Sequence, residues 1–208
     1  MEKKRILVMV TEGPTDQEFY KKVIEFTKNQ TKCLRFNFDE IKHMCAAGIG
    51  NMHKKMLAKF KIEICCNPEF LDYEKVVCFC YDLDVFKSAM NIAPIDIEKM
   101  KDDFRGCGAD KIIEIKANPN IEDFFMYDIE GIKKFLRLGR NYKLPKKRGL
   151  EALKQMYKDG CKLYIKGTRT TGLVESLNMG LILSKICSQV KSLCDELGYD
   201  CNGDICQG

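Results

Sequence analysis

Short apolar runs alternate with amphipathic helical patterns through roughly the first two thirds of this 208-residue chain. The predicted strands are residues 6–10, 34–41 (a weaker pattern), 76–81 and 111–116. The predicted helices are 15–28, a helical face over 52–60, 95–104 and a helix that starts at 121. Runs that are apolar on both faces are typical of parallel strands covered by helices. The pattern predicts an α/β fold, a Rossmann-like parallel sheet of about four strands flanked by helices.

The first helix carries a recognisable start signal. Thr15 and Glu18 have the spacing of a capping box, so we expect Thr15 to be the N-cap. The tight turn Thr11-Glu12-Gly13-Pro14 then joins the first strand to this helix.

Acidic residues and glycines follow each of the predicted strands. Glu12 follows the first, Gly48 and Gly50 follow the second, Asp82 and Asp84 follow the third, and Glu122 follows the fourth. Functional groups of parallel α/β sheets gather beyond the carboxyl ends of the strands. We therefore expect these residues to meet at one edge of the sheet.

Asp82 and Asp84 stand two residues apart, a spacing that puts both side chains on one face of an extended chain. Carboxylates held so close repel each other unless a cation lies beside them. Mg²⁺ or Mn²⁺ accepts such oxygen ligands, although aspartates are also common in turns. Glu12 is a candidate metal ligand or general acid/base; the alternative is a carboxylate that interacts with the helix dipole.

Positive charge is concentrated in the last third of the chain. Residues 133–169 contain 13 lysines and arginines but only two acids, in a chain whose net charge is +5. This asymmetry indicates a face for a polyanion such as DNA or RNA, the alternative being an ordinary solvated helical surface. The candidate phosphate-binding residues are Lys133, Lys134, Arg137, Arg140, Lys143, Lys146, Lys147, Arg148, Lys166 and Arg169.

The character of the sequence changes after Gly139, which predicts a basic, helical C-terminal extension over residues 139–208 packed on a domain formed by residues 1–138. Within the extension we expect a helix over 149–158, a short strand or extended piece over 162–166 and one long amphipathic helix over 173–197. That last helix can pack on its own sheet or on a second copy in a homodimer.

No apolar run approaches the length of a membrane span, and the N-terminal apolar run is too short for a secretory signal. We therefore expect a cytoplasmic protein without a membrane partner. Twelve cysteines are present, but no C-x-x-C pair, so a zinc ribbon is not expected.

Together these motifs resemble the Toprim domain of topoisomerases, bacterial primases and OLD-family nucleases. The resemblance rests on Glu12 after the first strand, the glycine loop at 48–51 and the Asp82-Leu83-Asp84 motif about 70 residues after Glu12. The Asn-Pro and Glu-aromatic segment over 118–125 resembles RloB-like and OLD-type Toprim proteins linked to phage defence. The likeness covers about residues 5–128, so residues 1–138 would be a Toprim-like catalytic domain.

This resemblance implies a Mg²⁺-dependent nuclease of phage defence or a mobile element. Catalysis would fall to Glu12, Asp82, Asp84 and Glu122, with Asp123 or Asp16 contributing to a second metal position. Gly48 and Gly50 would border the nucleic acid. No G-x-x-x-x-G-K-[ST] motif is present, so any ATPase partner would be a separate chain.

Two other functions stay open. One is a catalytically weak nucleic-acid-binding module that acts with that ATPase, and the other is nucleotidyl transfer. The sequence does not distinguish DNA from RNA as the substrate.

Overall fold

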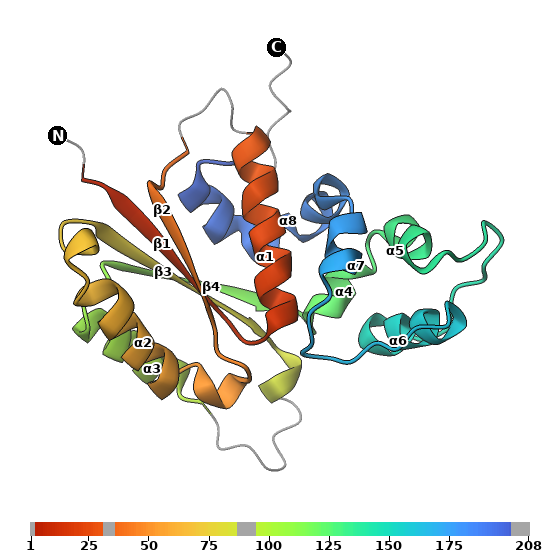
Figure 1. Cartoon of the computed structure of the whole chain (residues 1–208), viewed down its shortest axis with the longest axis horizontal. Helices are drawn as coiled ribbons and strands as arrows, with labels where there is room; N and C mark the ends of the chain where they lie inside the picture. Colours follow the sequence, from red (N-terminus) through yellow and green to blue (C-terminus); the bar gives the residue numbers. More distant parts are fainter. Residues whose placement is uncertain (1–2, 31–35, 87–94, 201–208) are drawn as a thin grey trace.

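Four parallel strands form the centre of the molecule (Figure 1). The computed structural model describes residues 3–30, 36–86 and 95–200. The strands are β1 (Arg5–Thr11), β2 (Glu40–Cys45), β3 (Glu74–Asp82) and β4 (Lys111–Ala117), in the order β2-β1-β3-β4. All three neighbouring pairs are parallel. The predicted α/β class, with a four-stranded parallel sheet between helices, is confirmed.

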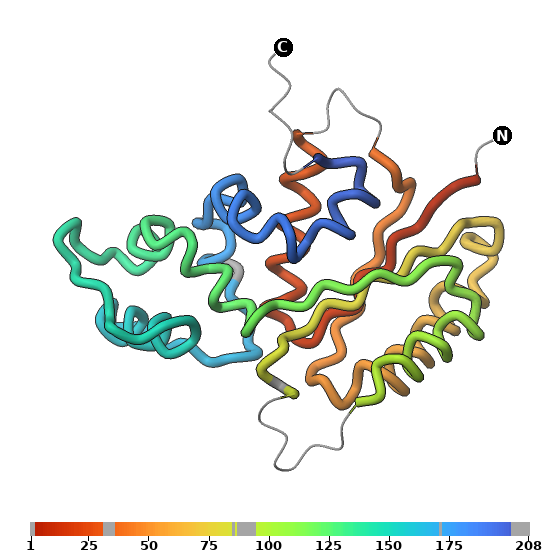
Figure 2. Tube along the Cα trace, turned by 180° about the vertical axis from the view of Figure 1, so that it is seen from behind, coloured from red at the N-terminus to blue at the C-terminus, as the bar shows by residue number. Residues whose placement is uncertain are grey.

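Helices cover both faces of this sheet, which explains why the central strands are apolar at almost every position. On one face, Leu7, Met9 and Cys78 share a core with α1 (Pro14–Gln30) and α8 (Met179–Leu197). On the opposite face, Val8 and Phe79 belong to a second core. The helices over that second core are α2 (Lys54–Phe60) and α3 (Ile97–Gly106), and Figure 2 shows them together on one side of the sheet.

The other helical elements are short. Single turns occur at η2 (Ile49–Asn51), η3 (Lys61–Cys65, a π-helix), η4 (Pro68–Phe70) and η5 (Asp84–Phe86). The remaining helices are α4 (Ile121–Phe125), α5 (Ile129–Leu136), α6 (Gly149–Asp159) and α7 (Thr171–Ser176). In Figure 1, α5, α6 and the long connection between them project to one side of the sheet, and we call this part, residues 129–159, the basic lobe.

The C-terminal extension is built into the first core. Residues of α6, α7 and α8 belong to the same buried cluster as residues of β1, β3 and α1, so one core spans the predicted boundary at residue 139. At the amino ends of the strands, Glu196 of α8 binds Arg5 Nη2 at 2.7 Å and also pairs with Lys111. The extension therefore completes the cover of the sheet.

Two sequence predictions need correction. The second strand is Glu40–Cys45, not 34–41; Leu34 lies outside the described residues, and Phe36 and Phe38 pack on the core before the strand begins. The start of the strand is set by its pairing with β1, which begins with Glu40 opposite Ile6.

The long helix predicted over 173–197 is two helices. Asn178 separates α7 from α8 and caps α8 by accepting a hydrogen bond from Leu181 N. Its own backbone N–H donates to Asp128 Oδ2 at 2.7 Å. A residue 50 positions away thus fixes the break, so the local periodicity could not reveal it.

Among the helices of the described residues, none combines the length and apolar composition that crossing a bilayer requires.

Candidate active site

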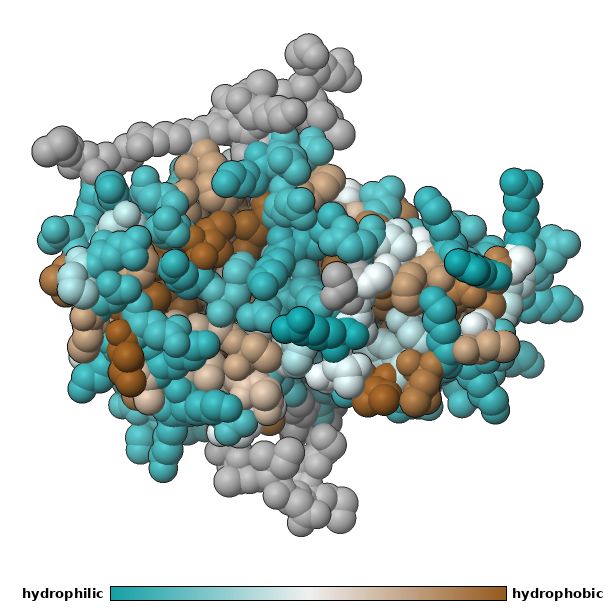
Figure 3. Space-filling model, viewed as in Figure 1, coloured by the Kyte–Doolittle hydropathy of each residue, from teal (hydrophilic) through white to brown (hydrophobic). Residues whose placement is uncertain are grey.

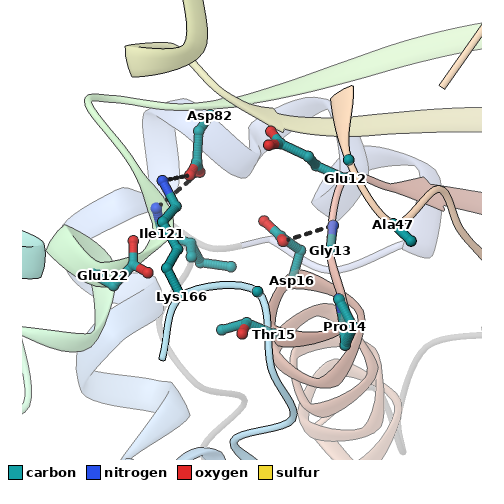
Figure 4. Close-up of a pocket in the computed structure, with 12 residues that line it drawn as sticks. Glu12, Gly13, Pro14, Thr15, Asp16, Ala47, Asp82, Ile121, Glu122 and Lys166 are labelled. Carbon is teal, nitrogen blue, oxygen red and sulfur yellow. Dashed lines mark hydrogen bonds and ion pairs between the residues drawn. The ribbon is translucent and has the colours of Figure 1, made fainter. Parts of the chain in front are cut away.

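A cavity of about 380 Å³ lies at the carboxyl ends of the strands. Its lining brings together segments that are far apart in the sequence, and Figure 4 shows their side chains around one space. The lining residues that matter below are Glu12, Asp16, Gly48, Asp82, Glu122 and Lys166. Loops after parallel strands commonly form such sites.

Glu12 enters this cavity from the end of β1. Its backbone N–H donates to Cys80 O at 3.2 Å, and its carbonyl accepts Gly48 N at 2.9 Å. Gly48 has φ 117°, a conformation that favours glycine, so the glycine loop can lie directly against the turn that carries Glu12. One carboxylate oxygen, Glu12 Oε2, is buried without a hydrogen-bond partner among the described residues.

Asp82 and Asp84 are held by the loop that follows β4. Ile121 N donates to Asp82 Oδ1 at 3.0 Å, and Asn120 Nδ2 donates to Asp84 Oδ2 at 3.1 Å. The two aspartates are not successive same-face residues of one strand, as predicted, because β3 ends at Asp82 and Asp84 begins η5. They nevertheless stay close, since one lysine contacts both.

That lysine is Lys166, from the segment between α6 and α7. Its ammonium lies 3.0 Å from Asp82 Oδ2 and 3.3 Å from Asp84 Oδ2. Lys166 was predicted to bind phosphate. In this structure it is instead the cation that lies beside the two aspartates, where the sequence predicted a metal ion.

Glu122 is fully buried at the start of α4. Tyr164 Oη donates to Glu122 Oε1 at 2.9 Å, whereas Glu122 Oε2 has no partner among the described residues. Sequence reasoning missed Tyr164. A usable signal was present, because Tyr164 and Lys166 have the two-residue spacing that puts both side chains on one face of an extended chain.

The segment that carries both residues is fastened to the start of α1. Thr15 Oγ1 donates to Thr168 O at 2.7 Å, and Thr170 N donates to Glu18 Oε2 at 2.6 Å. The predicted capping box of Thr15 and Glu18 is therefore wrong, since both side chains bind this distant segment. Asp16 Oδ2 instead accepts Gly13 N at 3.0 Å, at the start of the helix.

Burial shifts the acidic groups in the cavity toward their protonated forms. Burial and the nearby carboxylates of Glu122 and Glu12 raise the pKa of Asp82 to about 7, against the opposing effect of Lys166. Burial also raises the pKa of Glu12, of Glu122 and, most strongly, of Asp16. For Lys166, burial acts to lower the pKa, but Asp82 and Glu122 outweigh it and raise the pKa overall. Such clustered shifts are typical of functional sites.

The donor set suits a hard cation. Among the described residues, no three histidine, cysteine or acidic side chains lie close enough to share an ion in their present positions. However, the cavity has two buried carboxylate oxygens, on Glu12 and Glu122, that have no partner within the described part of the chain, and a single ammonium pairs with both Asp82 and Asp84. Carboxylate oxygens are the ligands that Mg²⁺ and Mn²⁺ prefer, so the residues present fit such an ion.

The other predicted ligands differ from one another. Asp16 lines the cavity but is also bonded to the backbone of Gly13. Asp123 is not among the lining residues: its carboxyl group lies against Gly149 at the start of α6, where an added Cβ would collide with it. Gly50 also lies outside the lining. The structure therefore brings Glu12, Asp16, Asp82 and Glu122 to the cavity, with Asp84 joined to them through Lys166.

The basic candidates also divide into two groups. Lys133 is almost buried, and its ammonium donates to Glu130 Oε1 at 2.9 Å and to Arg140 O at 3.2 Å. The remaining lobe candidates are exposed: Lys134, Arg137, Arg140, Lys143, Lys146, Lys147 and Arg148. Arg169 is exposed as well, close in sequence to Lys166. Lys133 is thus occupied inside the protein, while the others face solvent.

Comparisons with known proteins add little to this geometry. No protein-family model matches this sequence, and neither does a curated protein. A search of solved structures finds the C-terminal region of the OLD protein of Xanthomonas campestris pv. campestris, at 16% sequence identity and a TM-score of 0.39. That match covers 92% of this chain and 95% of the other.

Proposed function

We propose that this chain is a nuclease that uses Mg²⁺ or Mn²⁺ to hydrolyse phosphodiesters of DNA or RNA. The observation that carries the proposal is the cavity itself: carboxylates from three strand ends meet there, and one buried oxygen each of Glu12 and Glu122 has no partner among the residues that the structure describes. Burying ionisable carboxyl groups costs free energy. A purely structural role does not explain why several of them share one cavity.

Glu12, Asp82 and Asp84 would hold the ion, with Glu122 beside them. A bound divalent ion supplies a water of lowered pKa and neutralises charge on a phosphate. These roles agree with the resemblance of the Glu12 and Asp-x-Asp motifs to Toprim nucleases, which also suggests a role in phage defence or in a mobile element.

The protein's own groups supply the remaining chemistry. Tyr164 fixes one oxygen of Glu122 and leaves the other, Oε2, free to accept a proton. The raised pKa of Glu122 makes that proton transfer more favourable near neutral pH than it is for an exposed carboxylate. Lys166 provides a positive charge at the same site, which can pair with a phosphate oxygen.

One observation favours the weaker alternative, a nucleic-acid-binding module that acts with a separate ATPase. Lys166 already compensates Asp82 and Asp84, so these two carboxylates have a cation without any metal. A module of this kind would bind nucleic acid through the exposed cations of the basic lobe and would cleave little by itself.

A nuclease assay separates the two functions. The purified protein is incubated with end-labelled DNA and RNA in Mg²⁺, in Mn²⁺ and in EDTA. We expect shortened products only with a divalent ion, and their loss in Glu12→Gln. The matched control is Glu114→Gln, which changes another half-buried acid of the sheet, one that binds Tyr81 and Lys101 instead of lining the cavity.

Tight binding without cleavage under every condition would contradict the nuclease and support the binding module. Lengthened products would indicate nucleotidyl transfer instead.

A further inference from the structure

The segment between α6 and α7, residues 161–170, has two different faces. Tyr164 and Lys166 face the candidate site: Tyr164 Oη donates to Glu122 Oε1, and Lys166 lines the cavity, where it pairs with Asp82. Their neighbours Leu163 and Ile165 are 79% and 53% exposed. Side chains of an extended chain alternate between opposite faces, so the contacts of Tyr164 and Lys166 place Leu163 and Ile165 outward.

Several contacts hold this segment in place. Lys162 Nζ donates to Phe135 O at 3.3 Å and lies 3.9 Å from the centre of the Phe135 ring. At the other end, Thr168 O and Thr170 N are bonded to Thr15 and Glu18 of α1. The exposed apolar pair is therefore presented by a segment fixed at both ends.

Two exposed cations, Lys162 and Arg169, lie close to the pair in the sequence, and residues 160–170 contain no acidic residue. The third cation of the segment, Lys166, is already paired with Asp82 and Asp84. Figure 3 shows apolar surface beside hydrophilic surface where this segment crosses between the sheet and the basic lobe. Some nucleic-acid-binding proteins combine cations that attract phosphates with apolar side chains, leucine and isoleucine among them, that contact unstacked bases.

We propose that Leu163 and Ile165 contact the bases of unpaired nucleotides next to the phosphodiester in the cavity. The preferred substrate would then be a nucleic acid with a gap, flap or single-stranded region at the cut site. A continuous duplex offers this contact only after its bases have been unstacked, and that step costs free energy that an unpaired nucleotide does not require. This inference rests on the proposed nuclease function, since it takes the cavity to be the place where the phosphodiester lies.

The test compares one sequence in three forms: single-stranded, as a blunt duplex, and as a duplex with a short gap. Binding is measured in EDTA, so that cleavage plays no part, with 2-aminopurine in the unpaired strand to report unstacking. We expect the gapped and single-stranded forms to bind about tenfold more tightly than the blunt duplex. DNA and RNA versions are both measured.

The decisive variant is the double change Leu163→Ser and Ile165→Ser, which removes the apolar surface without touching the cavity. It should abolish the preference for unpaired nucleotides and the 2-aminopurine signal. The matched control is Ile62→Ser with Leu71→Ser, because these side chains are 71% and 59% exposed and lie outside the segment. The control should keep both properties.

Equal binding of all three forms, unchanged in the double variant, would overturn the inference. A shift of the double variant to a lower oligomeric state, with nucleic-acid binding intact, would also overturn it and make the pair a protein interface. Metal-dependent cleavage without any preference leaves the proposed function standing and refutes this inference alone. A preference that depends on the pair, in a protein that never cleaves, supports the contact and refutes the nuclease.

Discussion

The acidic cavity and the basic lobe carry opposite charges, and the charged side chains of the two regions also differ in their burial. In the cavity, Asp82 and Glu122 are 2% and 0% exposed. In the lobe, Lys143, Lys146 and Arg148 face solvent. An exposed lysine is fully hydrated and costs the fold nothing, whereas a buried carboxylate must be compensated. The cavity is therefore the stronger evidence for a function.

Lys166 connects the two regions. It belongs to the same basic stretch of sequence as the lobe, yet its ammonium forms an ion pair with a carboxylate at a strand end. A substitution in the cavity should consequently impair cleavage, whereas a substitution in the lobe should impair nucleic-acid binding.

The largest expected effect comes from Asp82→Asn. Removing this carboxylate should lower cleavage on the order of 10³-fold, the size of effect seen when a charged group is removed from a catalytic site. Nucleic-acid binding measured in EDTA should change little, because the lobe is untouched. A variant that cleaves at the normal rate would show that the cavity does not act on phosphodiesters.

The pH dependence of stability tests whether Asp82 is as strongly perturbed as its burial indicates. Its pKa rises from 3.8 to about 7 on folding, so the stabilisation is complete below pH 4 and is lost as the pH rises through 7. At 1.36 kcal/mol for each pKa unit, the loss for the ion-free protein is about 4 kcal/mol at most.

Urea unfolding at a series of pH values from about 4 to just above 7 measures this loss, because the loss develops between the unfolded and the folded pKa. The wild type should lose more free energy of unfolding over this interval than Asp82→Asn does, although the other cavity acids act in the same direction. Identical losses in the two proteins would mean that Asp82 keeps an ordinary pKa.

Neutralising exposed cations of the basic lobe should weaken nucleic-acid binding and make that binding less sensitive to salt concentration. In a variant with Lys143, Lys146, Lys147 and Arg148 all changed to Gln, the slope of log K against log salt should become shallower by about three, since each phosphate contact contributes about 0.7 to 0.9. The control is Lys133→Met, whose ammonium is already bound to Glu130 and to the Arg140 carbonyl. An unchanged slope in the four-residue variant would make the lobe an ordinary solvated surface.

The smallest effect concerns Lys166 as a competitor of the metal. Lys166→Met removes the ammonium from Asp82 and Asp84, so calorimetric titration with Mn²⁺ should show about fivefold tighter binding, the size expected for a partly exposed ion pair. Addition of Mn²⁺ should also raise the melting temperature of the variant more than that of the wild type. Weaker binding would instead show that Lys166 supports the ion.

Local sequence was sufficient for the strands and for the main acidic residues. The runs that became the central strands β1 and β3 are apolar at nearly every position because both sheet faces are covered, and the edge strand β4 keeps enough of this pattern to be recognised. Glu12 and Asp82 could be placed at one edge of the sheet because parallel strands end on the same side. Asp123 shows the limit, because its carboxyl group lies against Gly149 of α6 through packing that the local pattern does not record.

The sequence by itself determined the fold class, the edge of the sheet that carries the acids and the charge of the extension, because periodicity and composition are local properties. Only the tertiary structure decided that Thr15 and Glu18 bind residues 168–170 instead of capping a helix, that Tyr164 binds Glu122 and that Lys166 lines the cavity. These pairings join residues separated by more than 40 positions. Their formation depends on how α1, α4 and the segment 161–170 pack together, and no short stretch of sequence contains that information.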